Sequence, residues 1–548
     1  MKKYLLFIAI VAGGWHFSSA QGFGLGPKYN ETIYGIATYP EVIGADETGY
    51  YVYQSPYRLG NFSEITKYEG AAYARKSVPF RKFGKDLKLE KKAEIGLGTK
   101  SRPERAMGAL MLNSRIFLFS VFNERTEGRS ELFVREMNKK TLAVPTKGKS
   151  LGKVSFESSN FKGFMWYYFV NSADTSRILV VGQLPQKKGL PEKFVLKVLS
   201  DDMSLLWSKE VVLPYQEELF SVLSFSVDNS GKVYILGKNY FEKKDESVGR
   251  KPNYNFKILI LESDKQTPSE LTIDLEDKFL IDVNIEPMEN GQIVCAGAYS
   301  EKVDATKVRG IYYLAVDPVS NKIMKESYSD LRKSLFGGDD DLNEEDTPQK
   351  PREKRIFYDY VFRRMIPLSD GRTVLVAEEQ FRIDRQTTKT TTSAGPNGGY
   401  VSSSTRETIP VFYRNNIIVI FISPEGTIEN AEMIRKRQAI NYDFYFLSYG
   451  IFWNNSNLYF VFNDHIDNLT AGSRDRIQVF GDREPKKRIL ALVTLNSQGE
   501  TFRSELINLG DAQSISLSTT TYQVSQHEAV VFFQDRRKNN RRLGQISF

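Results

Sequence analysis

The sequence predicts an all-β protein made of one repeated unit. Short runs of Val, Ile, Phe, Tyr and Leu alternate with clusters of Gly, Asn, Asp, Ser and Pro along nearly the whole chain, as in strands joined by tight turns. No stretch of the sequence carries the apolar stripe of a helix over four turns. The apolar runs also recur in a fixed order, which is typical of a repeat architecture.

Each unit begins with a hairpin, in which an apolar strand, a polar turn and a stronger apolar strand follow one another. Gly, Asn and Asp suit such turns because they tolerate positive φ or bond the backbone with their side chains. The turn recurs eight times, at spacings of about 55 to 86 residues, at 46–49, 113–114, 173–176, 228–231, 288–291, 369–371, 454–457 and 524–526.

A second hairpin follows the first in the same unit, with turns at 200–203, 317–321, 423–426 and 496–499. Each unit is then a four-stranded antiparallel meander, and a closed ring of meanders buries both faces of every sheet. The pattern resembles the β-propeller superfold over nearly the whole chain, although it carries no Trp-Asp, kelch or complete Asp-box motif. The double-hairpin order argues against separate β-sandwiches, whose Greek-key connections cross over.

We therefore predict a β-propeller of seven or eight four-stranded blades. The last unit, 514–548, has room for only three strands. The segment 31–39 (ETIYGIATY) is expected to supply the missing outer strand and to lock the ring. Seven blades with one split unit is the alternative.

The first twenty residues predict a cleaved signal peptide. Lys2 and Lys3 precede an apolar run at 4–12, and Ser18, Ser19 and Ala20 offer small residues for cleavage. The run is far shorter than the ~20 residues of a spanning helix. We expect residues 21–548 to form a single exported propeller domain, in the periplasm, at the outer membrane or outside the cell. The Lys-, Arg- and Tyr-rich style resembles exported proteins of Bacteroidota-type bacteria.

Composition excludes several classes of protein. The 75 basic and 67 acidic residues leave a formal charge of +8, which is mild for this length and argues against dedicated nucleic-acid binding. The single cysteine, Cys295, rules out an internal disulfide. No phosphate-binding glycine loop, paired-cysteine motif or HExxH is present, so no cofactor is expected.

Two polar insertions interrupt adjoining units, near 330–354 and 385–407. The first holds six carboxylates at 339–346, and Asp339, Asp341 and Asn343 have the spacing of a calcium loop. Glu344 and Lys350 then occupy the positions of the required Gly and bidentate Glu, so a solvated loop is favoured over a Ca²⁺ site.

The second insertion is rich in Thr, Ser and Gly. TKTTT and YVSSST both have strand character and flank the Gly-rich segment 395–399, which suits an extended hairpin. Long insertions in compact units are functional or unstructured. A flexible projection and a partner-docking arm remain the two interpretations, and both insertions are expected on one side of the ring.

A basic turn near the C-terminus is a candidate for binding anionic lipid or polysaccharide at a membrane periphery. No aromatic residue interleaves with its charges, so a merely solvated turn is favoured. Its members are Arg536, Arg537, Lys538, Arg541 and Arg542.

His465 is the weak catalytic candidate, as a base oriented by Asp464 or Asp467. No nucleophile-elbow motif supports it. The sequence thus favours a non-catalytic binding or scaffold protein of the bacterial cell envelope, which docks a protein or glycan partner through loops on a rigid ring. A carbohydrate-active hydrolase or lyase, with carboxylates from different blades at the central channel, is the alternative. A metal-dependent enzyme or sensor using the acidic insertion is the third.

Overall fold

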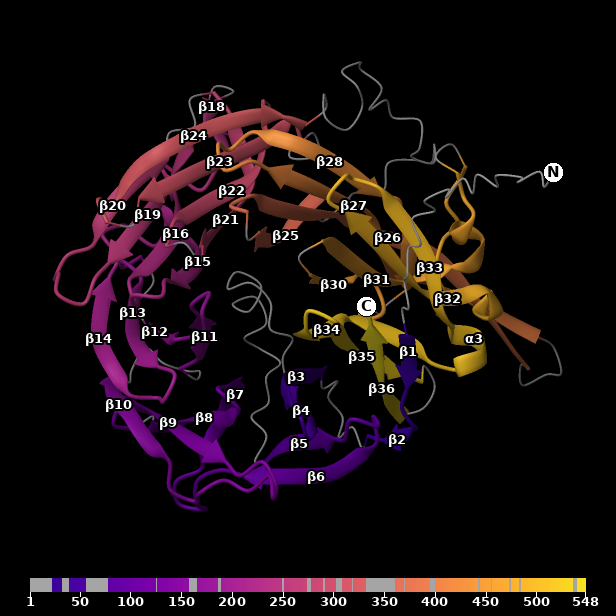
Figure 1. Ribbon diagram of the computed structural model, residues 1–548, viewed down its shortest axis with the longest axis horizontal. Coiled ribbons are helices and arrows are strands. Elements are labelled where there is room, and N and C mark those ends of the chain that lie inside the picture. The colour runs from indigo at the N-terminus through magenta and orange to yellow at the C-terminus, as the bar shows by residue number, and fades with distance from the viewer. Residues whose placement is uncertain are drawn as a thin grey trace, which may run out of the picture.

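The chain folds into a ring of eight antiparallel β-sheets, which confirms the predicted propeller (Figure 1). The computed structural model describes residues 22–31, 39–55, 77–331 and 360–548, apart from gaps at 125, 157–164, 186–188, 249–250, 274–276, 289–290, 302–307, 318, 369, 395–399, 442–443, 455, 473–474, 482–483 and 536–539. We number the blades in chain order from the first complete sheet. Within a blade the strands run from inner to outer.

Blade 1 comprises β3 (Tyr39–Asp46), β4 (Gly49–Ser55), β5 (Ser77–Phe83) and β6 (Leu89–Gly96), and blade 2 comprises β7 (Arg105–Leu112), β8 (Arg115–Glu124), β9 (Arg129–Met137) and β10 (Lys149–Ser155). Blade 3 comprises β11 (Tyr167–Asn171), β12 (Arg177–Leu184), β13 (Lys193–Ser200) and β14 (Leu205–Val212), and blade 4 comprises β15 (Phe220–Val227), β16 (Val233–Tyr240), β19 (Tyr254–Leu261) and β20 (Ser269–Ile273). A small hairpin, β17 (Ser247–Val248) with β18 (Lys251–Pro252), joins the middle strands of blade 4.

Blade 5 comprises β21 (Phe279–Pro287), β22 (Ile293–Ser300), β23 (Gly310–Asp317) and β24 (Lys322–Asp330), and blade 6 comprises β25 (Tyr360–Pro367), β26 (Thr373–Ala394), β27 (Tyr400–Ile422) and β28 (Ile428–Ile434), with β29 (Gln438–Asn441) beside β27. Blade 7 comprises β30 (Gly450–Trp453), β31 (Asn457–His465), β32 (Arg488–Asn496) and β33 (Thr501–Asn508). Blade 8 comprises β34 (Ile515–Ser525), β35 (Glu528–Gln534), β36 (Asn540–Ser547) and β1 (Gly22–Leu25), with β2 (Tyr29–Asn30) also paired with β36. The described helical turns are η3 (Ile466–Leu469), η4 (Pro485–Lys487) and α3 (Leu509–Ala512).

The hydrophobic core is divided into eight layers, one between each pair of neighbouring blades. Phe80, Phe119 and Phe194, from blades 1, 2 and 3, are each fully buried in such a layer. A single meander has two apolar faces, so each blade needs a neighbour on both sides and the ring supplies them.

The predicted first-hairpin turns are confirmed, because all eight join an inner strand to the second strand of its blade. Their local chemistry explains why the sequence reveals them. Asn113 and Ser114 form a two-residue turn with φ of 46° and 59°, and Gly49 has φ of 137°, where a Cβ atom would lie 1.9 Å from the carbonyl oxygen of Phe83.

The ring closes through the N-terminal strand, but not through the predicted segment. Gly22–Leu25 pairs with β36, from Gly22 opposite Ser547 to Leu25 opposite Gly544. Of the segment 31–39, residues 32–38 lie outside the described residues, and Tyr39 begins the inner strand of blade 1. Glu31 instead forms a buried ion pair with Arg81 at 2.6 Å, which ties the closing segment to blade 1.

Candidate functional site

The two faces of the ring differ in how they connect strands. The inner-to-second and third-to-outer turns share one face, which we call the turn face. The second-to-third connections and the crossings to the next blade share the other, which we call the loop face. Most of the longer connections lie on the loop face, so that face has the greater capacity for binding.

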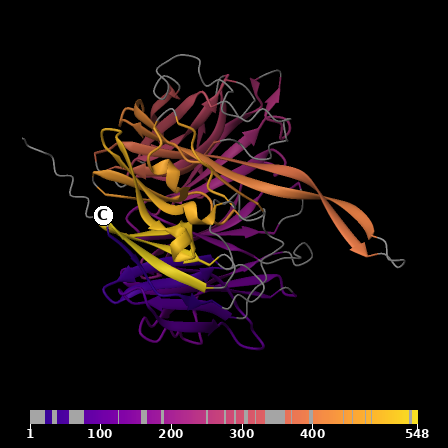
Figure 2. The same cartoon turned by 90° about the vertical axis from the view of Figure 1, so that its right-hand side faces the viewer.

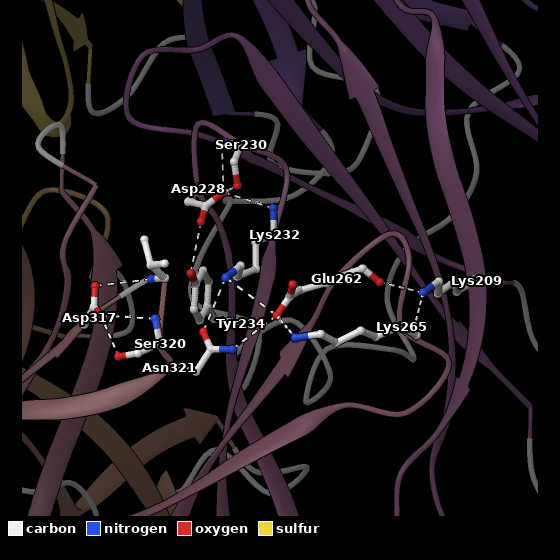
Figure 3. Close-up of polar contacts among 11 residues, drawn as sticks. Lys209, Asp228, Ser230, Lys232, Tyr234, Glu262, Lys265, Asp317, Ser320 and Asn321 are labelled. Carbon is white, nitrogen blue, oxygen red and sulfur yellow. Dashed lines mark hydrogen bonds and ion pairs between the residues drawn. The ribbon is translucent and has the colours of Figure 1, made fainter.

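On the turn face, polar groups of the turns in blades 4 and 5 bond to one another (Figure 3). Asp228 accepts hydrogen bonds from the backbone N–H groups of Ser230 and Lys232, both at 2.9 Å, and from the Tyr234 hydroxyl at 3.0 Å. Lys232 and Asn321 meet the Glu262 carboxylate, at 3.6 and 3.1 Å, and so link blades 4 and 5. These groups satisfy one another, which is the behaviour of structural turns.

The loop face carries one long arm, formed by the ends of β26 and β27 beyond blade 6. The two strands stay paired from Thr373 opposite Ile422 to Ala394 opposite Tyr400. Figure 2 shows this ribbon projecting well beyond the ring. The extended hairpin predicted for the Thr/Ser-rich insertion is confirmed, and the choice between a flexible projection and a partner-docking arm stays open.

A β-bulge marks the root of the arm. The register of β26 against β27 shifts between Glu378 and Gln380, where the strands leave the blade. Bulges re-aim a strand. Beyond the bulge, the Phe381 and Tyr413 rings stack with centroids 4.6 Å apart, and Arg385 donates a hydrogen bond to the Tyr413 hydroxyl at 2.6 Å. The direction of the arm is thus set by packed side chains at its root.

A fully buried ion pair holds that root. The Lys436 ammonium donates to Glu378 Oε1 at 2.8 Å, to the carbonyl oxygen of Arg414 at 3.0 Å and to Gln438 Oε1 at 3.1 Å. Glu378 and Lys436 side chains are both 0% exposed, and Ser448 donates to the second carboxylate oxygen at 2.7 Å. Burial lowers the pKa of Lys436, and the Glu378 carboxylate opposes that shift by favouring the ammonium.

The same network reaches two further blades. Gln438 donates to the carbonyl oxygen of Asn463 in blade 7 at 2.8 Å, and the Asn463 amide donates to the carbonyl oxygen of Ser516 in blade 8 at 2.8 Å. On the apolar side, Phe446 and Leu447 pack in the core layer between blades 8 and 1. We call this assembly the mount of the arm, and it spans blade 6 to blade 1.

The candidate base His465 is placed in a structural setting. Its ring is 6% exposed, Nδ1 accepts the backbone N–H of Asp467 at 3.3 Å, and Nε2 lies 3.5 Å from Glu484 Oε2. Asp464 accepts hydrogen bonds from Arg503 at 2.9 Å, from Asn468 at 2.7 Å and from the backbone N–H of His465 at 2.8 Å. The structure therefore brings the His465 imidazole together with Asp467, whereas Asp464 bonds the backbone N–H of His465.

The candidate basic turn is only partly described, because Arg536, Arg537 and Lys538 lie outside the described residues. Arg541 is 3% exposed and donates to Gln54 Oε1 of blade 1 at 2.9 Å, so it belongs to the ring closure and is not available for docking. Arg542 is half-buried in the same strand.

The calcium candidates Asp339, Asp341 and Asn343 also lie outside the described residues. The segment that contains them departs after β24 and returns at β25, so both of its ends lie on the loop face, as the base of the arm does. Among the residues that are described, no three His, Cys, Asp or Glu side chains are grouped to hold a metal ion. Likewise, no helix in the described part is long and apolar enough to cross a membrane.

Two glutamates on inner strands bear on the enzyme alternative. Burial raises the pKa of Glu41, on β3, to about 7. Burial also raises the pKa of Glu286, on β21, to about 7, although the Arg364 charge opposes the shift. Neighbouring protein groups surround the Glu286 carboxyl, although the residue keeps a solvent-exposed surface on its inner strand. The two residues belong to blades 1 and 5, on opposite sides of the ring, so they do not form a close carboxylate pair.

The mount is what sequence reasoning missed. Glu378 and Lys436 are 58 positions apart, and neither stands in a recognisable motif. The available signal was Glu378, which directly follows the apolar run 374–377, because a charge that is buried with such a run needs a charged or hydrogen-bonding partner.

Comparison with known proteins adds no function. No family model and no curated protein matches the sequence. Solved structures with a similar outline include a protein of unknown function from Bacteroides caccae (TM-score 0.25, 9% identity, 66% of this chain and 92% of that chain). Others are prolyl oligopeptidase B from Galerina marginata (0.36, 8%, 94% and 55%) and an apocarotenoid oxygenase from Synechocystis (0.26, 10%, 76% and 96%). At these scores the likenesses carry no argument about activity.

Proposed function

We propose that the protein is a non-catalytic binding module that docks a partner through its loop face, with the arm as the principal contact. The observation that supports this proposal is the combination of an exposed ribbon and a rigid mount. Ordering each backbone residue costs roughly 1–2 kcal/mol, and the described residues from Arg385 to Thr392 are exposed. The ring gains no core from them, so their benefit is expected to come from a partner.

The proposed setting is the bacterial envelope, with a protein or polysaccharide of that compartment as the partner. It rests on the N-terminal leader predicted from the sequence. Residue 22 and the C-terminal Phe548 lie on the turn face, opposite the arm. A tag at the C-terminus therefore leaves the loop face free.

The test compares the full chain with a variant in which 387–407 is replaced by an Asn-Gly turn. We expect the shortened variant to keep its melting temperature, because the mount is intact. We also expect it to lose the cross-linked capture of a partner from the native envelope. Binding is then reconstituted with the purified partner. A matched control deletes the β17–β18 hairpin on the loop face of blade 4, which should leave capture unaltered. Equal capture by the shortened chain would refute the arm as the main contact.

Glu41 favours a second candidate, a carbohydrate-active enzyme. A carboxyl group with a pKa of about 7 remains partly protonated at neutral pH and can act as a general acid. Incubation with purified envelope polysaccharides tests this function. Release of new reducing or unsaturated ends by the full chain, and their loss in Glu41→Gln, would support the enzyme over the binding module.

A further inference from the structure

The arm has two strand edges that the described strands leave open. β25 pairs with β26 only as far as Glu379, and β29 pairs with β27 only from Val411 to Arg414. Between these limits and the tip, β26 and β27 pair with each other alone among the described strands. Each outer edge therefore presents a row of backbone donors and acceptors.

The distal half of the arm lacks the features that usually block edge pairing. Proteins protect an open edge with charged residues, proline or bulges. From Thr390 to Ala394 and from Tyr400 to Thr405 the sequence carries no charge and no proline, and the register of these stretches is unbroken. Pro410 lies nearer the root, opposite Asp384.

The side chains of the arm offer hydroxyl groups in place of an apolar anchor. Thr390 and Ser404 oxygens are 3.2 Å apart across the strands, and those of Thr392 and Ser402 are 3.0 Å apart. These hydroxyl pairs bond to each other across the two strands of the arm. A two-stranded ribbon without an apolar face is marginal on its own, and a third strand stabilises it. Recognition by the backbone is thus the mode that suits this arm.

The charges on the arm indicate which kind of partner strand it would bind. The segment 385–407 holds the exposed basic residues Arg385, Lys389 and Arg406 against one acid, Glu407. Two copies of the arm would bring like charges together, whereas an acidic edge would meet complementary charge.

We propose that the arm binds its partner by strand addition, pairing an open edge of β26 or β27 with the exposed, acidic edge strand of another protein's β-sheet. This inference rests on the proposed binding function and names the chemistry of the partner.

The experiment measures hydrogen exchange of the arm amides in the full-length protein. The probe is a synthetic, end-capped peptide of alternating valine and glutamate. One control is the same peptide with N-methylated backbone amides, which keeps the charges and removes the donors, and the other replaces glutamate with lysine. We expect the acidic peptide to slow exchange in 387–394 or 400–406, and both controls to have much weaker effects.

The matched variant is Lys389→Glu, which changes an exposed residue and leaves the mount intact. The apparent affinity for the acidic peptide should fall by roughly fivefold, the upper range for one exposed charge pair, and affinity for the lysine peptide should rise. Protection by the N-methylated peptide equal to that by its parent would overturn strand addition. Protection that grows with protein concentration alone would overturn it in favour of a second copy.

The failure of this inference is distinguishable from failure of the proposed function. If no peptide protects the arm but the shortened chain still loses partner capture, the binding function stands and strand addition falls. If the shortened chain captures the partner normally, the arm is not the docking element and both fall.

Discussion

Breaking the buried ion pair of the mount should destabilise the whole ring. The perturbation is Lys436→Met, which approximately keeps side-chain volume and removes the ammonium. The Glu378 carboxylate, at 0% exposure, then loses its ammonium partner and keeps the Ser448 hydroxyl at 2.7 Å and Arg414 Nε at 3.8 Å. It also removes the ammonium that donates to the carbonyl oxygen of Arg414 at 3.0 Å and to Gln438 Oε1 at 3.1 Å, although Gln438 Oε1 keeps the backbone N–H of Ser448 at 2.7 Å.

The magnitude follows from these distances. At an effective dielectric of 20, a charge pair at 2.8 Å is worth about 6 kcal/mol and one at 3.8 Å about 4 kcal/mol before desolvation. Arg414 therefore compensates for part of the loss. Removing one partner of a buried pair costs about 3–5 kcal/mol, and we expect about 3 kcal/mol here. The double variant Glu378→Gln with Lys436→Met removes both charges and should lie within about 1–2 kcal/mol of the native chain.

Urea unfolding of the native chain, both single variants and the double variant completes the cycle. Hydrogen exchange at the arm root provides a second measurement, because a loosened mount should expose Phe381 and its neighbours. A Lys436→Met chain as stable as the native one, or a double variant as unstable as the single one, would show that the pair does not hold the mount.

Three further outcomes are expected. Glu41→Gln should stabilise the protein by up to about 3 kcal/mol at pH 8 and be neutral near pH 4. The native carboxyl has a pKa of about 7 against an unfolded value near 4.5, so the stability of the native chain falls as pH rises across that window. Urea midpoints at both pH values measure the effect, and equal gains at the two pH values would contradict it. Glu31→Gln should cost about 3 kcal/mol in urea unfolding by leaving Arg81, whose side chain is 5% exposed, without its buried partner; a loss under about 1 kcal/mol would mean that Glu94, 3.4 Å away, is sufficient. Excess Ca²⁺ and chelator should give the same melting temperature, and a clear rise with Ca²⁺ would instead indicate a Ca²⁺ site, for which Asp339, Asp341 and Asn343 are the predicted ligands.

The sequence revealed what depends on local chemistry. Turn residues such as Asn113 and Gly49 adopt positive φ, which their residue types favour, so the positions of the turns could be predicted from the sequence. The order of the hairpins, and from it the propeller, followed from those turns. TKTTT and YVSSST similarly indicated the arm, because their strand character flanks a glycine-rich segment.

Tertiary pairing was not accessible in the same way. The closing strand reads GFGL, with two glycines and no β-branched residue, and only its contact with β36 makes it a strand. The pattern ETIYGIATY is richer in strand-forming residues and therefore predicted the closing strand at 31–39, and this prediction is wrong. Arg541 looked like part of an exposed basic run, yet it lies in β36, where the ring closure buries it. The mount joins Glu378 to Lys436 across the blade, a proximity that no local pattern encodes.

The closing strand also determines which step of folding can occur only at the end. Gly22 pairs with Ser547, and Ser547 is synthesised after all the other blades of the ring, so this contact has a very large sequence separation. Non-local pairings of this kind are slow to form and leave edges exposed meanwhile. Blades can assemble one after another as they emerge, but the seam between the last blade and the first must wait until β36 has been synthesised. The protein is therefore expected to be most vulnerable to aggregation and proteolysis just before the seam forms, and a chain truncated by even one C-terminal strand should never leave that vulnerable stage.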